Sequence, residues 1–182
     1  RLVRNAKIAL LDKEIEIKYL LSLLNSNLLN FYFQLIYADN RDTFPIMKSG
    51  NIESLPIVKI DKKSQKPFIK KSDLMLSKHK ELEKLEQKFL DLLVSDFKLE
   101  GLSNKLKNWM ELQWNEVEKE LKKFNRTVRG KDKEEWFERF SRFKKQGEEI
   151  QSLIKTTDEE IDNMVYELYE LTEEEIKIVE WK

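Results

Sequence analysis

Three Glu-x-Lys triplets are the residues of this chain whose type and spacing come nearest to catalytic chemistry. They match one piece of a metal-dependent nuclease active site, and they are Glu16-Ile17-Lys18, Glu120-Leu121-Lys122 and Glu175-Ile176-Lys177. A chain with 34 basic and 34 acidic residues produces such triplets by chance, and none of the three has a partner aspartate in a strand context. We therefore expect no catalytic residues. A nuclease that uses Glu16 and Lys18 stays as an alternative.

Other kinds of site lack the residues they need. There is no cysteine, and the single histidine, His79, lies among lysines and glutamates. Metal centres and catalytic triads need several convergent groups, so we expect neither. There is no glycine-rich phosphate loop, and no two prolines are adjacent, which rules out an Asn/Asp-Pro-Pro-Tyr motif. We expect no cofactor in this chain.

Charge is distributed unevenly along a chain whose formal net charge is zero. The segment from Asp61 to Lys71 holds five lysines and one aspartate, a net charge of +4, and we read it as a basic loop. Such a loop is either solvated or in contact with phosphates. The segment from Thr156 to Lys182 has ten acidic residues and two lysines, a net charge of −8. Solvated helix faces and favourable helix-dipole contacts explain those acids.

The elements that position these charges begin with an apolar stretch. Leucines and aromatic residues recur every three or four positions from Leu20 to Leu35, on more than one face, which is typical of a buried helix. The polar run at residues 25–27 predicts a break in it. Pro56 makes residues 55–58 an edge strand. Residues 3–11 would form a strand that has lost its neighbours.

The rest of the chain has the spacing of amphipathic helices. We expect helices from Ser72 to about Lys98, from Leu106 to Asn125, and from Lys133 to Lys155, with further helices beginning at Thr157 and Thr172. Their apolar seams cannot stay exposed, and the short loops favour antiparallel packing. One aromatic set suits a hairpin core better than a stacking platform for single strands: Trp114, Trp136, Phe137, Phe140 and Phe143.

Composition supports the same fold class. Charged residues make up 37% of the 182 residues, against ~25% in an ordinary domain, and there are only 4 glycines and 3 prolines. We predict a mainly α fold, an antiparallel helical hairpin or coiled-coil-like bundle with a small α/β remnant at the N-terminal end. We expect the domains to be 1–60 and 61–182. No apolar run approaches the ~18 residues that cross a membrane, and the lack of cysteine fits the cytoplasm.

Three stretches carry a family resemblance: LLSLLNSNLLNFYF at 20–33, FPIMKSGNIESLPIV at 44–58 and IDNMVYELYELTEEEIKIVE at 161–180. In this order they resemble the end of the target-recognition region of TaqI-type adenine-N6 DNA methyltransferases and the related type IIG restriction-modification enzymes. Type I specificity subunits are similar. Two positions differ: Asn27 stands where the family commonly has lysine, and Glu170 where it often has glycine.

The resemblance implies a non-catalytic C-terminal DNA-specificity and spacer module. The parent would be an S-adenosylmethionine-dependent methyltransferase that acts on double-stranded DNA. Its catalytic region would precede Arg1 or lie in a partner subunit, so we expect the chain to be a piece of a longer protein. The DNA contacts we predict are to phosphates: Arg41, Lys48, Lys62, Lys63, Lys66, Lys70 and Lys71. The alternative is a helical homodimerisation module without DNA binding.

Overall fold

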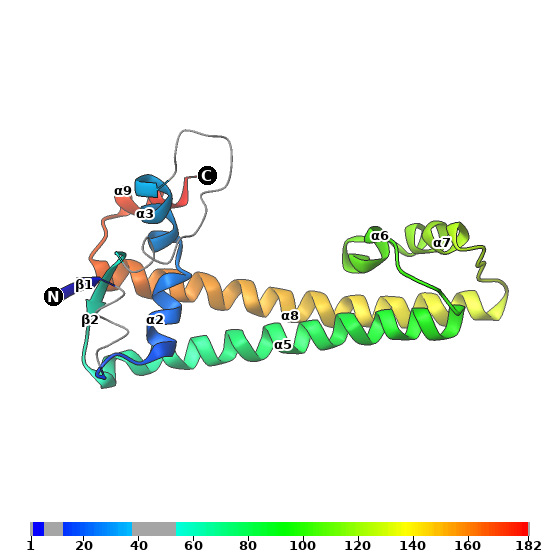
Figure 1. Ribbon diagram of the computed structural model, residues 1–182, viewed down its shortest axis with the longest axis horizontal. Helices are drawn as coiled ribbons and strands as arrows, with labels where there is room; N and C mark the ends of the chain where they lie inside the picture. Colours follow the sequence, from blue (N-terminus) through cyan, green and yellow to red (C-terminus); the bar gives the residue numbers. More distant parts are fainter. Residues whose placement is uncertain (1, 6–12, 38–53, 182) are drawn as a thin grey trace. The chain divides into compact units, whose positions relative to one another are not determined.

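The structure is a computed structural model that describes residues 2–5, 13–37 and 54–181 (Figure 1). The chain forms two compact units, of which unit 1 is Arg1–Leu76 with Lys155–Lys182, and unit 2 is Ser77–Ile154. Two long helices contribute to both: α5 (Lys62–Phe97) and α8 (Lys131–Tyr169). The prediction of a mainly α fold with a small α/β part at the N-terminal end is confirmed.

Unit 1 contains a two-stranded antiparallel sheet. Strand β1 (Leu2–Asn5) pairs with strand β2 (Pro56–Lys59), so that Leu2 lies opposite Lys59 and Asn5 opposite Pro56. The expectation that the first strand has no neighbour is wrong, because β2 provides one. The part of the predicted strand after Asn5 lies outside the described residues. Pro56 takes the first position of its strand, where a missing N–H donor is tolerated.

The predicted break in the apolar helix separates helix α2 (Ile17–Leu24) from helix α3 (Asn27–Tyr37). Polar side chains at the break bond to carbonyls of the last turn of α2. The Asn25 amide donates to the Leu21 carbonyl at 2.9 Å, and the Ser26 hydroxyl donates to the Leu23 carbonyl at 2.7 Å. These side chains end α2 by offering its backbone an alternative to further helix.

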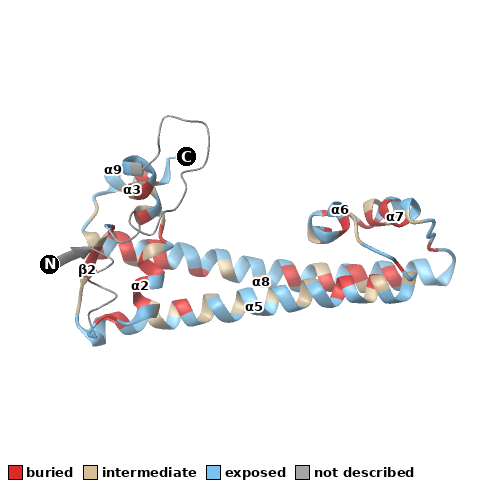
Figure 2. Ribbon diagram, in the orientation of Figure 1, coloured by how far each residue is buried: buried red, intermediate tan, exposed pale blue. Residues whose placement is uncertain are grey.

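The core of unit 1 joins residues far apart in the sequence. Tyr19, Leu20 and Leu23 of α2 are buried with Val58 of β2 and Phe68 of α5. The last part of α8 completes the cluster with Ile161, Val165 and Leu168. The apolar face of α2 is therefore covered by α5 and α8 within unit 1 (Figure 2).

Helix α9 (Glu173–Glu180) follows α8 and contacts α3. It begins where the sequence predicts, since the Thr172 hydroxyl and the Glu175 carboxylate form a capping box. This bonding lowers the pKa of Glu175, chiefly through the backbone N–H of Thr172.

The predicted basic loop is wrong, because α5 begins at Lys62 and not at Ser72. Asp61 caps it, with Oδ1 accepting from the N–H groups of Lys63 at 2.8 Å and Ser64 at 3.1 Å. Pro67 lies inside the helix. It has no N–H to donate to the Lys63 carbonyl, so the helix lacks that bond one turn after its start. Ser72, the predicted cap, is buried instead.

The predicted helix start at Thr157 is also wrong, because α8 runs through it without a break. Thr157 is 1% exposed and lies well inside the helix. Buried apolar residues on both sides of it, Phe143 in unit 2 and Ile161 in unit 1, are held in separate cores. Packing on each side therefore outweighs the local capping pattern.

In unit 2 the second half of α5 and the first half of α8 pack antiparallel. Phe89 meets Phe143 at 5.5 Å between ring centroids, and Phe97 meets Trp136 at 5.0 Å. The predicted helix from 106 to 125 is wrong, since this stretch forms three short helices: α6 (Asn104–Lys107), η1 (Trp109–Glu111) and α7 (Trp114–Lys123). A capping box at Gln113 starts α7.

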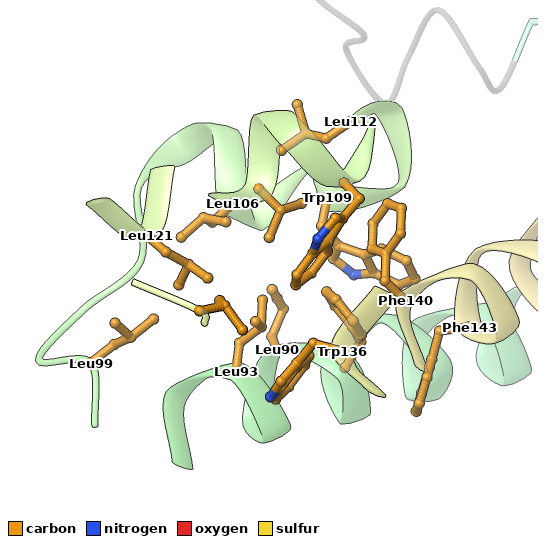
Figure 3. Packing of buried hydrophobic residues seen from close by; sticks show 14 residues of the cluster. Leu90, Leu93, Leu99, Leu106, Trp109, Leu112, Leu121, Trp136, Phe140 and Phe143 are labelled. Atoms are coloured by element: carbon orange, nitrogen blue, oxygen red, sulfur yellow. The ribbon is translucent and has the colours of Figure 1, made fainter. Parts of the chain in front are cut away.

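An aromatic core holds these helices on α5 and α8 (Figure 3). Phe89 and Trp109 are fully buried, with ring centroids 4.0 Å apart. The Glu120 carboxylate, also buried, accepts from the Ser103 hydroxyl at 2.9 Å and so ties α7 to the cap of α6. Its pKa is lowered, first by the hydrogen bond from Lys123.

Candidate nucleic-acid interface

Three of the predicted DNA-contacting lysines lie along one face of the first turns of α5. Lys63, Lys66 and Lys70 are three and four residues apart, a spacing that aligns side chains on a helix. All three are exposed, and none has an ion-pair partner among the described residues. We call these three residues the α5 lysine stripe. They are free to meet an external anion.

The two other predicted lysines of this segment are engaged within unit 1. The Lys62 ammonium lies 3.3 Å from a Glu16 carboxylate oxygen, and Lys71 forms an ion pair with Glu160. Their positive charge is therefore partly neutralised by the protein. Arg41 and Lys48 lie outside the described residues.

One member of the lysine stripe, Lys63, lies in the first turn of α5, where a positive charge is unfavourable for the helix itself. The first turn of α5 contains no acidic residue, and only the cap, Asp61, is negative. Hydrogen bonds from the Ser64 hydroxyl and backbone lower the pKa of Asp61. A cation in the first turn opposes the helix dipole by ~0.3–1 kcal/mol, and this effect falls off beyond that turn. An anion bound beside the stripe would offset this repulsion.

Buried polar contacts hold the segment before α5 together and fix it to α5 and α8. The Tyr19 hydroxyl donates to the Val58 carbonyl at 2.7 Å, and the Tyr169 hydroxyl donates to the Pro56 carbonyl at 2.7 Å. The Gln65 amide, fully buried, donates to the Glu14 carbonyl at 2.7 Å and the Ile60 carbonyl at 3.0 Å. Its oxygen accepts from the Glu16 N–H at 2.8 Å.

The most distant of these contacts joins α8 to the start of α3. The Asp162 carboxylate accepts from the backbone N–H and the side-chain amide of Asn27, both at 2.7 Å. Asp162 is only 6% exposed, and its oxygens satisfy the first free N–H of α3. Sequence reasoning missed this pair. The available signal was a carboxylate inside the apolar stripe formed by Ile161, Met164 and Val165.

The residues of the Glu-x-Lys triplets make contacts within the fold. Glu16 pairs with Lys62, and Lys18 pairs with Asp73. The glutamates of the other triplets take part in helix capping contacts. His79 is exposed on α5. Over residues 2–5, 13–37 and 54–181, no group of three or more His, Cys, Asp or Glu side chains is placed to hold a metal ion.

The aromatic set behaves mostly as the sequence predicts. Trp114, Trp136, Phe140 and Phe143 are buried in the core of unit 2, so they offer no stacking platform. Phe137 is the exception, at 51% exposed. It lines an open hollow with Trp114 and the ion-paired Glu118 and Lys133.

Two protein-family models match the chain, and the boundary between the two matches lies just before the start of α5. Residues 61–165, more than half of the chain, match the family model described as "Domain of unknown function (DUF8810)". The chain belongs to this DUF8810 family. Residues 2–57 match the TaqI-like C-terminal specificity domain, which confirms the resemblance seen in the sequence. The stretch at 161–180 lies outside that second match.

Two further findings concern the chain as a whole. No curated protein and no solved structure matches it. Among the helices in the described part of the chain, none has the length and apolar character needed to cross a membrane.

Proposed function

We propose that the chain is the non-catalytic C-terminal DNA-specificity and spacer module of a DNA methyltransferase or restriction-modification enzyme. The match of residues 2–57 to a TaqI-like C-terminal specificity domain carries this proposal. The catalytic, S-adenosylmethionine-dependent region would lie elsewhere in the same protein or in a partner subunit. The chain's own part is to place the recognition domain on its DNA target.

The packing of unit 1 supports a spacer role for the DUF8810 region. Asp162 and Gln65, both within the DUF8810 match, bind the backbone of the specificity segment at Asn27 and Glu16. Helices that are bonded to a recognition domain at several buried points move with it. They can therefore hold it at a set distance from a partner.

The α5 lysine stripe is the part of unit 1 that we assign to the DNA backbone. Exposed, unpaired lysines bind phosphates through charge alone, and such contacts position a protein on DNA without reading its sequence. Base-reading residues are not assigned.

A salt-dependence experiment tests this assignment. The variant carrying Lys63→Glu, Lys66→Glu and Lys70→Glu would be compared with the unmodified chain for binding to a fluorescent DNA duplex, between roughly 50 and 200 mM salt. We expect weaker binding and a slope of log affinity against log salt that is smaller by about 2.7, since each lost phosphate contact contributes about 0.9.

The matched control carries the same change of charge on exposed lysines elsewhere: Lys80→Glu, Lys84→Glu and Lys145→Glu. An equal loss in the control would show that net charge alone attracts DNA, and would refute the assignment. A chain that forms a stable dimer and binds no duplex at low salt would instead support the dimerisation alternative.

A further inference from the structure

A second basic segment lies in unit 2, at the connection between α7 and α8. Residues Lys122 to Lys133, with the sequence KKFNRTVRGKDK, contain six basic residues and one acidic residue, a net charge of +5. This exceeds the +4 of the segment at the start of α5. None of these residues belongs to the specificity-domain match.

Three of the six basic side chains form ion pairs or hydrogen bonds within unit 2. Lys123 pairs with Glu120 at 2.6 Å, and Lys133 pairs with Glu118 at 2.9 Å. Arg126 donates to the Phe97 carbonyl at 2.7 Å, where it satisfies the C-terminal end of α5.

The other three cations are Lys122, Arg129 and Lys131, which we call the turn cations. All three are exposed, and none has an ion-pair partner within the part of the chain that the structure describes. Lys131 is the first residue of α8, where a positive charge opposes the helix dipole. Arg129 and Lys131 therefore form no ion pair with the described residues that would compensate their positive charge.

The backbone of this connection is held in a defined shape. Asn125 and Gly130 have positive φ angles of 58° and 59°, and the Arg126 N–H donates to the Leu121 carbonyl at 3.0 Å. Val128 is 9% exposed and anchors the middle of the connection in the unit 2 core. Arg129 therefore lies on an anchored connection, and Lys122 and Lys131 lie at the ends of the two helices that it joins, which lowers the entropy cost of binding.

We propose that the turn between α7 and α8 binds the phosphate backbone of DNA as a second contact, separate from the α5 lysine stripe. The turn cations are exposed and spread over ten residues, which suits a repeating polyanion better than one small anion. The neighbouring hollow is a poor site for one small anion, because Lys133, which lines it, is already paired with Glu118. The choice of DNA as the polyanion rests on the proposed function.

The test compares three variants on the same DNA duplex. The turn variant carries Lys122→Glu, Arg129→Glu and Lys131→Glu, and it is measured beside the α5 stripe variant and the control variant described above. We expect the turn variant to reduce the salt slope by about 2.7, whereas the control leaves it unchanged. Circular dichroism checks that the helices of all variants remain folded.

The outcomes separate this inference from the proposed function. A loss in the turn variant with no loss in the stripe variant would support the second contact and refute the α5 assignment. A loss in the stripe variant alone would overturn the second contact and leave the proposed function standing. Equal losses in the turn and control variants, or no binding by the unmodified chain at low salt, would overturn it as well.

Should the turn variant be unfolded, Arg129→Gln and Lys131→Gln provide a milder pair. They remove two charges without adding repulsion, so the salt slope should fall by about 1.8. An unchanged slope in this folded pair would overturn the second contact.

Discussion

Replacing Asp162 with alanine removes the acceptor that joins α8 to the first turn of α3. The two bonds to Asn27 are both 2.7 Å long, and the carboxylate is 6% exposed. The substitution leaves the Asn27 N–H and its side-chain amide without these acceptors in a part-buried site. Asp162→Asn keeps one oxygen and places an amide against an amide, so its effect should be intermediate.

The magnitude follows from the bonds that are lost. A hydrogen bond to a carboxylate is worth ~1.5–3 kcal/mol, and the loss of a helix N-cap costs ~1 kcal/mol. These contributions overlap, so we expect Asp162→Ala to destabilise unit 1 by about 3 kcal/mol. At tenfold per ~1.4 kcal/mol, amide hydrogens of α3 that exchange by local opening should exchange roughly a hundredfold faster.

Hydrogen exchange read by mass spectrometry is the suitable assay, because it separates the units. Three of the four tryptophans, at 109, 114 and 136, belong to unit 2, so tryptophan fluorescence reports mainly on that unit. Peptides from α3 should lose protection, whereas peptides from α6 and α7 should not.

The matched control is Asp158→Ala, which removes an exposed carboxylate one turn earlier on the same helix. Exposed substitutions of this kind usually stay within ~0.5 kcal/mol. If Asp158→Ala and Asp162→Ala gave the same increase in exchange, the bond to Asn27 would not be what holds α3, and the reasoning would fail.

Two other predictions concern unit 1. Gln65→Leu removes three hydrogen bonds from a fully buried side chain and should lower the free energy of unfolding of the unit by about 2–4 kcal/mol. Urea unfolding followed by far-UV circular dichroism measures this loss. A loss of less than ~0.5 kcal/mol would contradict the role given to Gln65. Burial raises the pKa of Tyr169 and of Tyr166 from 10.0 to about 12. As the pH rises, the two tyrosine hydroxyls therefore ionise in the unfolded chain before they ionise in the folded one. Their contribution to the free energy of unfolding is complete below pH 10 and disappears as the pH rises to about 12. For Tyr169 the loss is up to about 2–3 kcal/mol, and Tyr169→Phe should show a shallower decline over this range.

The sequence predicted the elements whose signals are local. The break after Leu24, the strand at Pro56 and the helix start at Thr172 depend on residues within a few positions of one another, and the structure has all three. The start of α5 was misplaced because Pro67 and the lysines resemble a loop. What fixes the helix there is the buried Phe68, which meets the Tyr19 ring at 5.3 Å.

The other differences between the predicted and the observed helix boundaries also arise where local sequence signals compete with packing or are weak. Thr157 with Glu160 has the pattern of a capping box, but packing on both sides carries α8 through it. The helix predicted from Leu106 to Asn125 is broken by a cap at Gln113, a residue type with weak preference for that position. For the candidate site, the sequence identified the lysines, but only the fold shows that Lys62 and Lys71 are already paired.

The contact between Asn27 and Asp162 spans 135 residues of sequence, which has a consequence for folding during synthesis. Chains are made at about 5–20 residues per second, so Asp162 is added roughly 7 to 27 seconds after Asn27. Unit 2 is continuous in sequence and can pack within that interval. The segment that matches the specificity domain is made first, yet its α3 helix must wait for α8 before it is capped. During that interval the apolar residues of α2 and α3 remain available to chaperones.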